Sequence, residues 1–278
     1  MTVFAGQGDA HRSMSLLWAA PDVPRAGRSG PKPALSVAAI VTAGIAVADA
    51  EGMAALSMRA VGERLGRTAM ALYTYVPGKG ELLDLMHDRV HAELPVDYDL
   101  GDGWRPAATA WAEDAFACYL RHPWVLQISQ ARPVLGPAEL GAMESLLRIL
   151  GGAGLPTRVL RGVVAALWQL VRGMARTAAE ARAAAAATGV PDEEWWYARS
   201  ARLAELAPDF ADRFPLLTAL ESDAGTETAA GTGTDADAGT AAPDGGGNPL
   251  EAQTLAAFRT GLAVLLDGVE AAVGRRAG

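Results

Sequence analysis

The stretch that decides the fold is Leu56–Leu83, which reads LSMRAVGERLGRTAMALYTYVPGKGELL. A short helical pattern ends at Gly66 and a second one ends before Pro77, so a turn joins the two. Inward-facing apolar residues, Leu72 among them, would pack the two helices together and leave the outer face of the second helix free. Because a helix presented in this way fits the major groove of DNA, the spacing predicts a helix-turn-helix.

Helical periodicity dominates the rest of the chain, and strand patterns are nearly absent. Apolar residues recur at the spacing of one face of an amphipathic helix. The expected helices cover residues 34–50, 58–65, 68–75, 81–94, 104–120, 139–150, 158–187, 193–206 and 251–273. The sequence therefore predicts an all-α protein, with a helix-turn-helix DNA-binding domain over residues 31–79 and a helical bundle over residues 80–278.

Two stretches have the composition of unstructured chain. Residues 1–30 contain Gly, Pro and Ser without a strong helical pattern, and we expect a disordered tail there. Between Ser222 and Asn248 the chain holds mainly Ala, Gly, Thr and Asp, and no large apolar residue. Such a segment cannot bury enough surface to order itself, so we expect a flexible loop over residues 222–249.

Composition also indicates the compartment. The chain has one cysteine, Cys118, which agrees with a reducing environment and excludes an internal disulfide. The N-terminus lacks the pattern of a secretory signal, and the longest alanine tract, Ala183–Ala187, is far too short to span a bilayer. We therefore expect a cytoplasmic protein that makes no contact with a membrane.

The net charge of −8 is unevenly distributed. Between Arg25 and Lys79 there are seven basic and three acidic residues, which gives this segment +4 and leaves −12 for the remainder. A locally positive face is what binding to a polyphosphate requires, whatever the total charge. A chance fluctuation of surface charge explains this one observation equally well.

Two long apolar stripes, Leu160–Met174 and Leu255–Val269, exceed what one helix layer can cover. We predict that they form a four-helix bundle with the same helices of a second copy, so that the protein is a homodimer. A twofold dimer would hold its recognition helices about 34 Å apart and bind a near-palindromic operator in double-stranded DNA.

The deciding stretch and its surroundings resemble the DNA-binding domain of the tetracycline-repressor (TetR) family. The matching segments are the helix Val37–Ala50, AALSMR at 54–59, AVGERLG at 60–66, LYTYV at 72–76, and Lys79 followed by ELL at 81–83. The segments similar to the family's C-terminal domain are RHPW at 121–124, RP at 132–133, the helix Met143–Leu150 followed by GGAGL, and FRTGL at 258–262. The resemblance implies a transcriptional regulator, by the family's habit a repressor, in which a ligand inside the bundle shifts the separation of the two DNA-binding heads.

The resemblance also implies which side chains meet DNA. The predicted contacts are Arg59, Arg67, Thr68, Ala69, Met70, Thr74, Tyr75 and Lys79. Arg59 would reach a guanine edge or a phosphate; the alternative is a solvated arginine at the helix start. Met70 would touch an apolar base edge such as a thymine methyl, unless it packs beneath the first helix of the head. Tyr75 and Lys79 match phosphate-contacting positions, whereas Tyr73 is expected to face the core.

The candidate ligand pocket is large and apolar. Its expected lining is Trp111, Ala115, Leu146, Trp168 and Met174, with Gln169 and Arg172 as polar groups. Such a lining is typical of small-molecule sites, although ordinary core packing is the simpler explanation for any single apolar residue. Arg172 is the exception, because a charge beside an apolar stripe requires an anionic or carbonyl partner, whether Glu144, Glu180 or a ligand. The family's tetracycline–magnesium positions map onto Trp111, Leu146 and Gln169 without a metal-binding histidine, which argues against tetracycline as the effector.

Other chemistry is not expected. His87 and His91 are four residues apart on one helix, but two imidazoles without a third ligand, which His122 does not supply, make no metal site. We therefore predict neither a metal nor another cofactor. The chain offers no paired carboxylates with a pocket, no Ser/His/Asp set and no phosphate-binding glycine loop, which argues against an enzyme. We expect a repressor released by a small apolar or aromatic ligand; a DNA-binding regulator without a small-molecule effector is the alternative.

Overall fold

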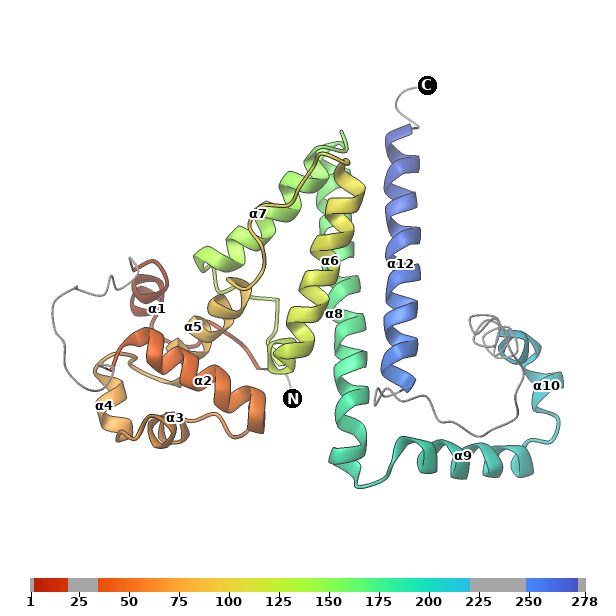
Figure 1. Cartoon of the computed structure of the whole chain (residues 1–278), viewed down its shortest axis with the longest axis horizontal. Coiled ribbons are helices and arrows are strands. Elements are labelled where there is room, and N and C mark those ends of the chain that lie inside the picture. The colour runs from red at the N-terminus through yellow and green to blue at the C-terminus, as the bar shows by residue number, and fades with distance from the viewer. Residues whose placement is uncertain (1–2, 20–34, 221–248, 275–278) are drawn as a thin grey trace, which may run out of the picture. The chain divides into compact units, whose positions relative to one another are not determined.

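The computed structural model describes residues 3–19, 35–220 and 249–274, and these are almost entirely helical (Figure 1). β-Pairing among the described residues is limited to one isolated parallel bridge between Val3 and Ile128. The all-α prediction is confirmed, and the helices expected from the periodicity lie within a few residues of their expected positions.

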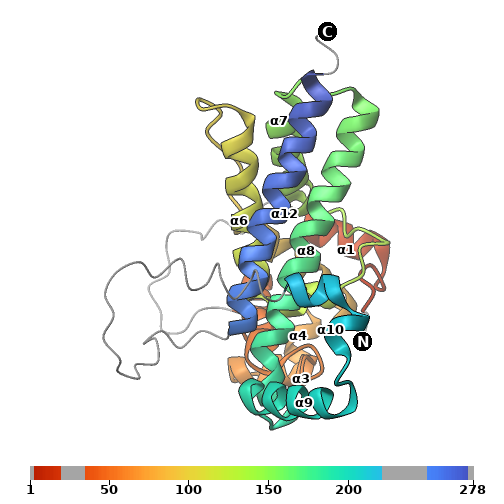
Figure 2. The same cartoon turned by 90° about the vertical axis from the view of Figure 1, so that its right-hand side faces the viewer.

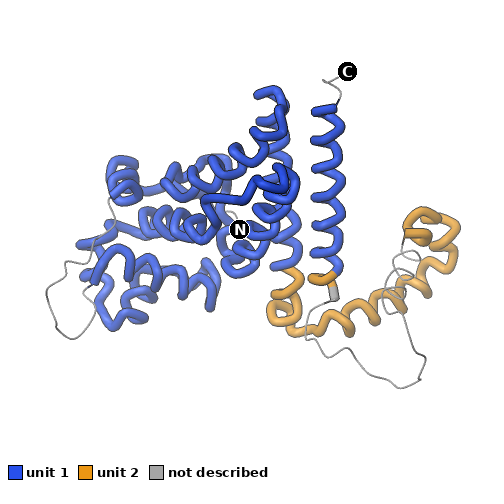
Figure 3. The backbone as a smooth tube through the Cα atoms, turned by 45° about the horizontal axis from the view of Figure 1, so that its top comes forward, with its two compact units in different colours: residues 1–179, 253–278 blue, residues 180–252 orange. Residues whose placement is uncertain are grey.

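The chain divides into two compact units, which Figure 3 distinguishes by colour. Unit 1 comprises Met1–Ala179 and Gln253–Gly278, and so contains the helix-turn-helix together with most of the helical bundle. Unit 2 is Glu180–Ala252 and includes α9 (Asp192–Leu206) and α10 (Phe210–Arg213). Neither of these two helices buries a residue, and the large core cluster belongs to unit 1.

The N-terminal head is built from α2 (Val37–Glu51), α3 (Met58–Leu65) and α4 (Ala69–Tyr73). Ser36 and Ser57 start α2 and α3, because each hydroxyl accepts a hydrogen bond of 3.1 Å from the backbone N–H three residues further on. These caps satisfy N–H groups that the first turn of a helix leaves without partners.

The turn between α3 and α4 depends on two glycines. Gly66 ends α3 with a φ of 63°, in the left-handed region that glycine adopts without steric cost. A Cβ on Gly62 would lie 2.7 Å from the backbone carbonyl oxygen of Arg67, so any larger residue would push the two helices apart. With Leu72 fully buried between them, α4 is held in one orientation.

The rest of unit 1 forms the body. Its helices are α5 (Lys79–His91), α6 (Trp104–Arg121), the 3₁₀ helix η1 (Pro123–Gln127), α7 (Pro137–Gly151), and the parts of α8 (Thr157–Thr188) and α12 (Pro249–Gly274) that lie in this unit. α12 runs beside α8 (Figures 1 and 2). Phe116 of α6 stacks on Phe258 of α12 with ring centroids 4.5 Å apart, which fixes α12 on the body.

The N-terminal arm, residues 3–18, differs from the tail that the sequence indicated. α1 (Ala10–Leu17) packs against α5, and Val3 forms two backbone hydrogen bonds with the 127–129 segment. On α5 the buried carboxylate of Asp84 accepts hydrogen bonds from the Gly6 N–H (2.8 Å) and from the Ser13 hydroxyl (3.0 Å). Residues 3–19 are therefore not a free tail. Residues 20–34, and 222–248 of the expected loop, lie outside the described residues.

Candidate DNA-binding surface and ligand pocket

α4 is anchored on one side and open to solvent on the other. Leu72 is fully buried, whereas Met70 keeps 75% of its surface exposed. The alternative in which Met70 packs beneath the first helix of the head is therefore wrong. Thr68 precedes α4 as its N-cap, but its hydroxyl makes no cap hydrogen bond and remains available to another partner. The short helix thus offers an apolar side chain and a hydroxyl, both of which suit base edges.

The other predicted DNA contacts are also at the surface. Arg59, Arg67, Thr74, Tyr75 and Lys79 are exposed, and Ala69 is half-buried. Arg59 forms an ion pair of 2.8 Å with Glu63 one turn further along α3, and both side chains are largely exposed. Such a surface pair contributes little to stability, so it offers little resistance to a phosphate that competes for the guanidinium.

Tyr73 lies at the surface, so the prediction that it faces the core is wrong. It is 44% exposed, whereas Leu72 and Val76 take the two buried positions at this end of the head. Adjacent residues on a helix point about 100° apart, so Tyr73 cannot share the inward direction of Leu72. Tyr73 is therefore a surface residue of α4 that the sequence reasoning missed as a candidate DNA contact.

Three of the seven predicted pocket residues line cavities. An apolar cavity of about 600 Å³, here called the α7–α8 groove, is lined by Trp168 and Gln169 together with Met143, Leu147, Leu160 and Val164. A second cavity of about 680 Å³, here called the Arg172 cavity, is lined by residues 126–131, Gln169, Arg172, Gly173 and Arg176. The remaining predicted residues are elsewhere: Trp111, Ala115 and Leu146 are fully buried in the core, and Met174 is partly buried.

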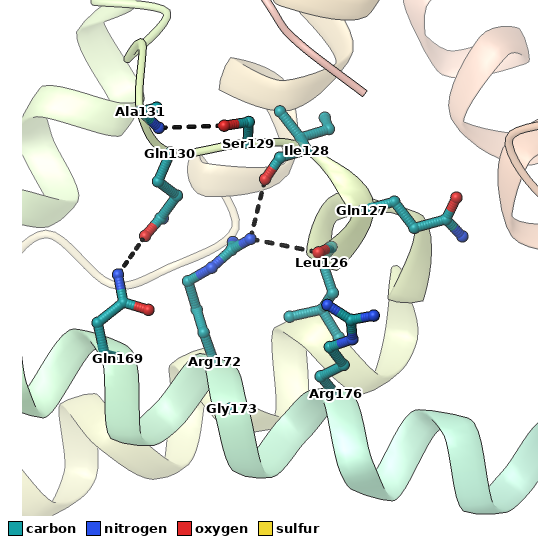
Figure 4. A pocket seen from close by; sticks show the side chains of 10 residues that line it. All are labelled: Leu126, Gln127, Ile128, Ser129, Gln130, Ala131, Gln169, Arg172, Gly173 and Arg176. Atoms are coloured by element: carbon teal, nitrogen blue, oxygen red, sulfur yellow. Dashed lines mark hydrogen bonds between the residues drawn. The ribbon is translucent and has the colours of Figure 1, made fainter. Parts of the chain in front are cut away.

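Arg172 is the only one of the predicted residues whose charge is buried, since 8% of its surface is exposed. Its Nη2 donates hydrogen bonds to the carbonyl oxygens of Ile128 (3.1 Å) and Leu126 (3.5 Å), as Figure 4 shows. Its guanidinium also lies 5.4 Å from the ring centroid of Tyr119. Carbonyl groups, rather than the carboxylates of Glu144 or Glu180, are thus the hydrogen-bond partners within the described residues.

Unpaired polar atoms gather around this region. The buried atoms without a hydrogen-bond partner among the described residues are Trp111 Nε1, Trp168 Nε1, Arg172 Nη1, His87 Nδ1 and His91 Nε2. The rings of Trp111 and Trp168 are 5.2 Å apart, those of Trp168 and His91 are stacked at 6.3 Å, and those of His91 and His87 are 4.4 Å apart. Buried polar groups are normally hydrogen-bonded to protein or to ordered water, so each of these atoms can take a polar partner. Of the five residues, Trp168 and Arg172 line the cavities described above.

The two histidines of this cluster are neutral near pH 7. Burial lowers the pKa of His91 to about 4, and burial together with the charges of His91 and Arg172 lowers the pKa of His87 well below its usual value. His91 Nδ1 lies 2.8 Å from the carbonyl oxygen of His87, which can only accept, so Nδ1 carries the proton and Nε2 is left as an acceptor. The cluster therefore offers both donors and an acceptor.

A hydrogen-bonded contact between head and body, the Asp49 junction, was not foreseen. Asp49 at the end of α2 accepts hydrogen bonds from Trp124 Nε1 and from His122 Nδ1, both 2.8 Å long. The other ring nitrogen of His122 lies 3.2 Å from a carboxylate oxygen of Glu93, which also pairs with Arg121 at 3.0 Å. The junction ties the DNA-binding head to η1 and to the end of α5.

Among the described residues, no group of three or more His, Cys, Asp or Glu side chains could hold a metal ion. Within the same part of the chain, no helix is long and apolar enough to cross a membrane.

Comparison with known proteins shows which family has this architecture. The family model for the tetracyclin repressor-like C-terminal domain matches residues 98–237. HTH-type transcriptional repressor DrrR1 of Streptomyces coeruleorubidus is 42% identical over 223 residues, which cover 80% of this chain and 81% of the relative. The chain belongs to the TetR family of transcriptional regulators. An HTH-type transcriptional regulator of Saccharopolyspora erythraea is 34% identical over 127 residues, covering 46% of this regulator and 54% of that protein.

Solved structures share the regulator's fold. Apo ActR from Streptomyces coelicolor aligns with a TM-score of 0.63 at 22% identity, covering 88% of this chain and all of that one. The complex of ActR with actinorhodin aligns with a TM-score of 0.61 at 24% identity, covering 87% of this regulator and 100% of that chain. The family resemblance read from the sequence is confirmed. The TetR family consists of transcriptional regulators and not of enzymes, which agrees with the expectation from the sequence.

Proposed function

We propose that this regulator is a homodimeric repressor that binds a near-palindromic operator through α4 and is released when a small molecule occupies the body. The observation that carries the proposal is the arrangement of α4, in which Leu72 is fully buried while Met70 is 75% exposed. A helix fixed on its inner side with its outer side free is what entry into the major groove requires. A regulator of this kind acts where the chromosome lies, so we place it in the cytoplasm.

Dimerisation is supported by the surface that α8 and α12 form together. A shallow groove of about 440 Å³ runs between the two helices and is lined by Arg158, Val159, Gly162, Val163, Ala166, Leu265, Gly268, Val269 and Ala272. Most of the α12 stripe, including Phe258, Leu262 and Leu266, is already buried within the chain. What a second copy would cover is therefore this groove, whose small residues allow close approach of the partner's helices.

Ligand-controlled release is supported by the two cavities and by the unpaired buried polar atoms beside them. ActR, which has the same fold, was crystallised with actinorhodin and with (S)-DNPA. A ligand acts only through different affinities for the two states, so it must favour a head position that fits the operator poorly. The second candidate function, an operator-binding regulator without a small-molecule effector, lacks an explanation for this buried and unsatisfied cluster.

Binding of the purified full-length protein to double-stranded DNA from around its own gene tests the proposal. We expect affinity that falls steeply with salt, because lysine and arginine contacts to phosphates release counterions. Arg67→Ala should relax the preference for particular bases, and Gly268→Arg, in the α8–α12 groove, should give monomers on sizing. Salt-insensitive binding, or none on any of this DNA, would contradict the proposal.

A further inference from the structure

The α7–α8 groove and the Arg172 cavity share two lining residues, and one hydrogen bond joins them. Gln169 and Gln130 line both cavities, and Gln169 Nε2 donates to Gln130 Oε1 at 3.1 Å. In Figure 4 the two amides meet between the helix that carries Arg172 and the segment that follows η1. A hydrogen bond between two partly exposed amides contributes little to stability, so a ligand that replaces it can open the contact.

The two cavities differ in chemistry. The groove has mainly apolar walls, including Met143, Leu160 and the indole of Trp168, and it suits a flat apolar body. Its lining also holds one acidic and one basic side chain, Glu139 and Arg161. The Arg172 cavity has two guanidinium groups in its lining, those of Arg172 and Arg176, and no carboxylate. A ligand that spans both cavities would place an aromatic part in the groove and a negatively charged part beside Arg172.

The state of Arg172 favours an anion over a neutral group. Arg172 is 8% exposed, its Nη1 has no hydrogen-bond partner among the described residues, its Nη2 donates to two carbonyl oxygens, and the side chain of Tyr119 lies beside the guanidinium. A buried charge whose partners are carbonyl dipoles and a neutral tyrosine retains a desolvation cost that a carboxylate can offset. Paired N–H groups of a guanidinium also match the two oxygens of a carboxylate.

We propose that the effector is an aromatic carboxylate, whose ring system lies against Trp168 in the α7–α8 groove and whose carboxylate binds Arg172 after the Gln130–Gln169 hydrogen bond opens. This inference rests on the proposed ligand-controlled release and specifies its chemistry.

The hydrogen bonds of Arg172 also explain how a ligand in the body affects the DNA-binding head. The carbonyl groups that Arg172 holds belong to Leu126 and Ile128, at the C-terminal end of η1. At the other end of η1, Trp124 is bonded to Asp49 of the head. A carboxylate that draws the guanidinium away from these carbonyls removes one hold on this end of η1 and leaves the two backbone hydrogen bonds of Val3 to the 127–129 segment. This loosening changes the position of the head to which the other end is attached.

The experiment uses matched probes on the full-length protein: benzoate, 2-naphthoate and anthracene-2-carboxylate, each beside its uncharged amide. Affinity is measured by calorimetry and by quenching of tryptophan fluorescence, and operator release by anisotropy of labelled DNA. We expect at least one acid to bind about tenfold more tightly than its amide, since a charged hydrogen-bonded pair gains roughly that much over a neutral one. That acid also releases the operator at lower concentration than its amide does.

Three variants show whether Arg172 is responsible. Arg172→Met should abolish the preference for the acid, while Arg176→Met, which changes the other and more exposed arginine of the same cavity, should keep it. Arg172→Lys retains the charge without the guanidinium geometry and should keep part of the preference, which covers the case in which Arg172→Met does not fold. Gln169→Leu removes the Gln130–Gln169 hydrogen bond and should raise the affinity for the acid several-fold.

The outcomes separate the two proposals. Equal affinity for acids and amides, a preference that survives in Arg172→Met, or no binding of any acid at millimolar concentration would overturn the aromatic carboxylate. Release of the operator by an amide as readily as by the acid would leave ligand-controlled repression in place and reject only this ligand class. Failure of the unliganded protein to bind operator DNA would instead reject the proposed function.

Discussion

The Asp49 junction gives the sharpest test of how head and body are joined. Replacing Asp49 with alanine removes the acceptor of two hydrogen bonds, from Trp124 Nε1 and His122 Nδ1, each 2.8 Å long. His122 keeps Glu93 at 3.2 Å on its other nitrogen, but the indole N–H of Trp124 loses its partner. The change therefore affects the connection between α2 and η1 while leaving the predicted DNA contacts unaltered.

The size of the effect follows from burial. Trp124 is 1% exposed, and a buried N–H left without a partner costs about 1–3 kcal/mol. The Asp49 side chain is 30% exposed, so water can approach the vacated position, and the lower half of that range applies. We expect Asp49→Ala to lower the free energy of unfolding by about 1–2 kcal/mol, and Asp49→Asn, which keeps one carbonyl acceptor, by about half as much.

Urea unfolding followed by tryptophan fluorescence measures this difference, with Glu51→Ala as the matched control at an exposed position on the same helix. Operator affinity measured in parallel should fall in Asp49→Ala and stay unchanged in Glu51→Ala, because a loosened head loses more entropy on binding. If Asp49→Ala unfolds within about 0.5 kcal/mol of Glu51→Ala, the junction is a surface contact and the reasoning fails.

Three further predictions concern separate parts of the chain. Lys79→Ala should weaken binding to all DNA sequences alike and reduce the salt slope by about one unit in titrations at several salt concentrations; a loss confined to one base pair would exclude a phosphate contact. Because the folded-state pKa of His91 is lowered to about 4, the unfolded state takes up protons first as the pH falls below about 6.5. The free energy of unfolding should therefore fall by on the order of 3 kcal/mol between about pH 6.5 and about pH 4. Thermal unfolding of His91→Phe should show a smaller fall over this range, and equal pH profiles of stability for the two proteins would refute the prediction. Ser13→Ala removes a hydrogen bond of 3.0 Å to the buried Asp84 and should cost about 1–2 kcal/mol in urea, whereas Ser15→Ala on the exposed side of the same helix should cost little.

The head was predictable from the sequence because its determinants are local. The serine caps, the glycine that ends α3 and the inward position of Leu72 all act within a few residues of where they stand. Tyr73 was misplaced for a local reason too, since α4 is so short that a shift of one residue changes which side chain faces inward.

The body's site was only partly predictable because its contacts are long-range. The α8 stripe indicated Trp168, Gln169 and Arg172, and all three line a cavity. Gln130 lies in an irregular segment 39 residues before its partner Gln169, and no periodicity indicates such a position. The N-terminal arm escaped notice for the same reason, since Ser13 bonds to Asp84, 71 residues further along the chain.

The position of η1 is set by its anchors rather than by its own hydrogen bonds. A 3₁₀ helix of five residues has poor hydrogen-bond geometry and little stability of its own. Trp124 near its start is held by Asp49 of the head, and the carbonyls of Leu126 and Ile128 at its end are held by Arg172 beside the ligand cavity. Val3 also holds the end of η1 through two backbone hydrogen bonds, so we expect a change at either anchor to shift η1 only slightly. We therefore expect the predicted DNA-binding surface and the proposed ligand cavity to influence each other without touching, because both act on the same segment.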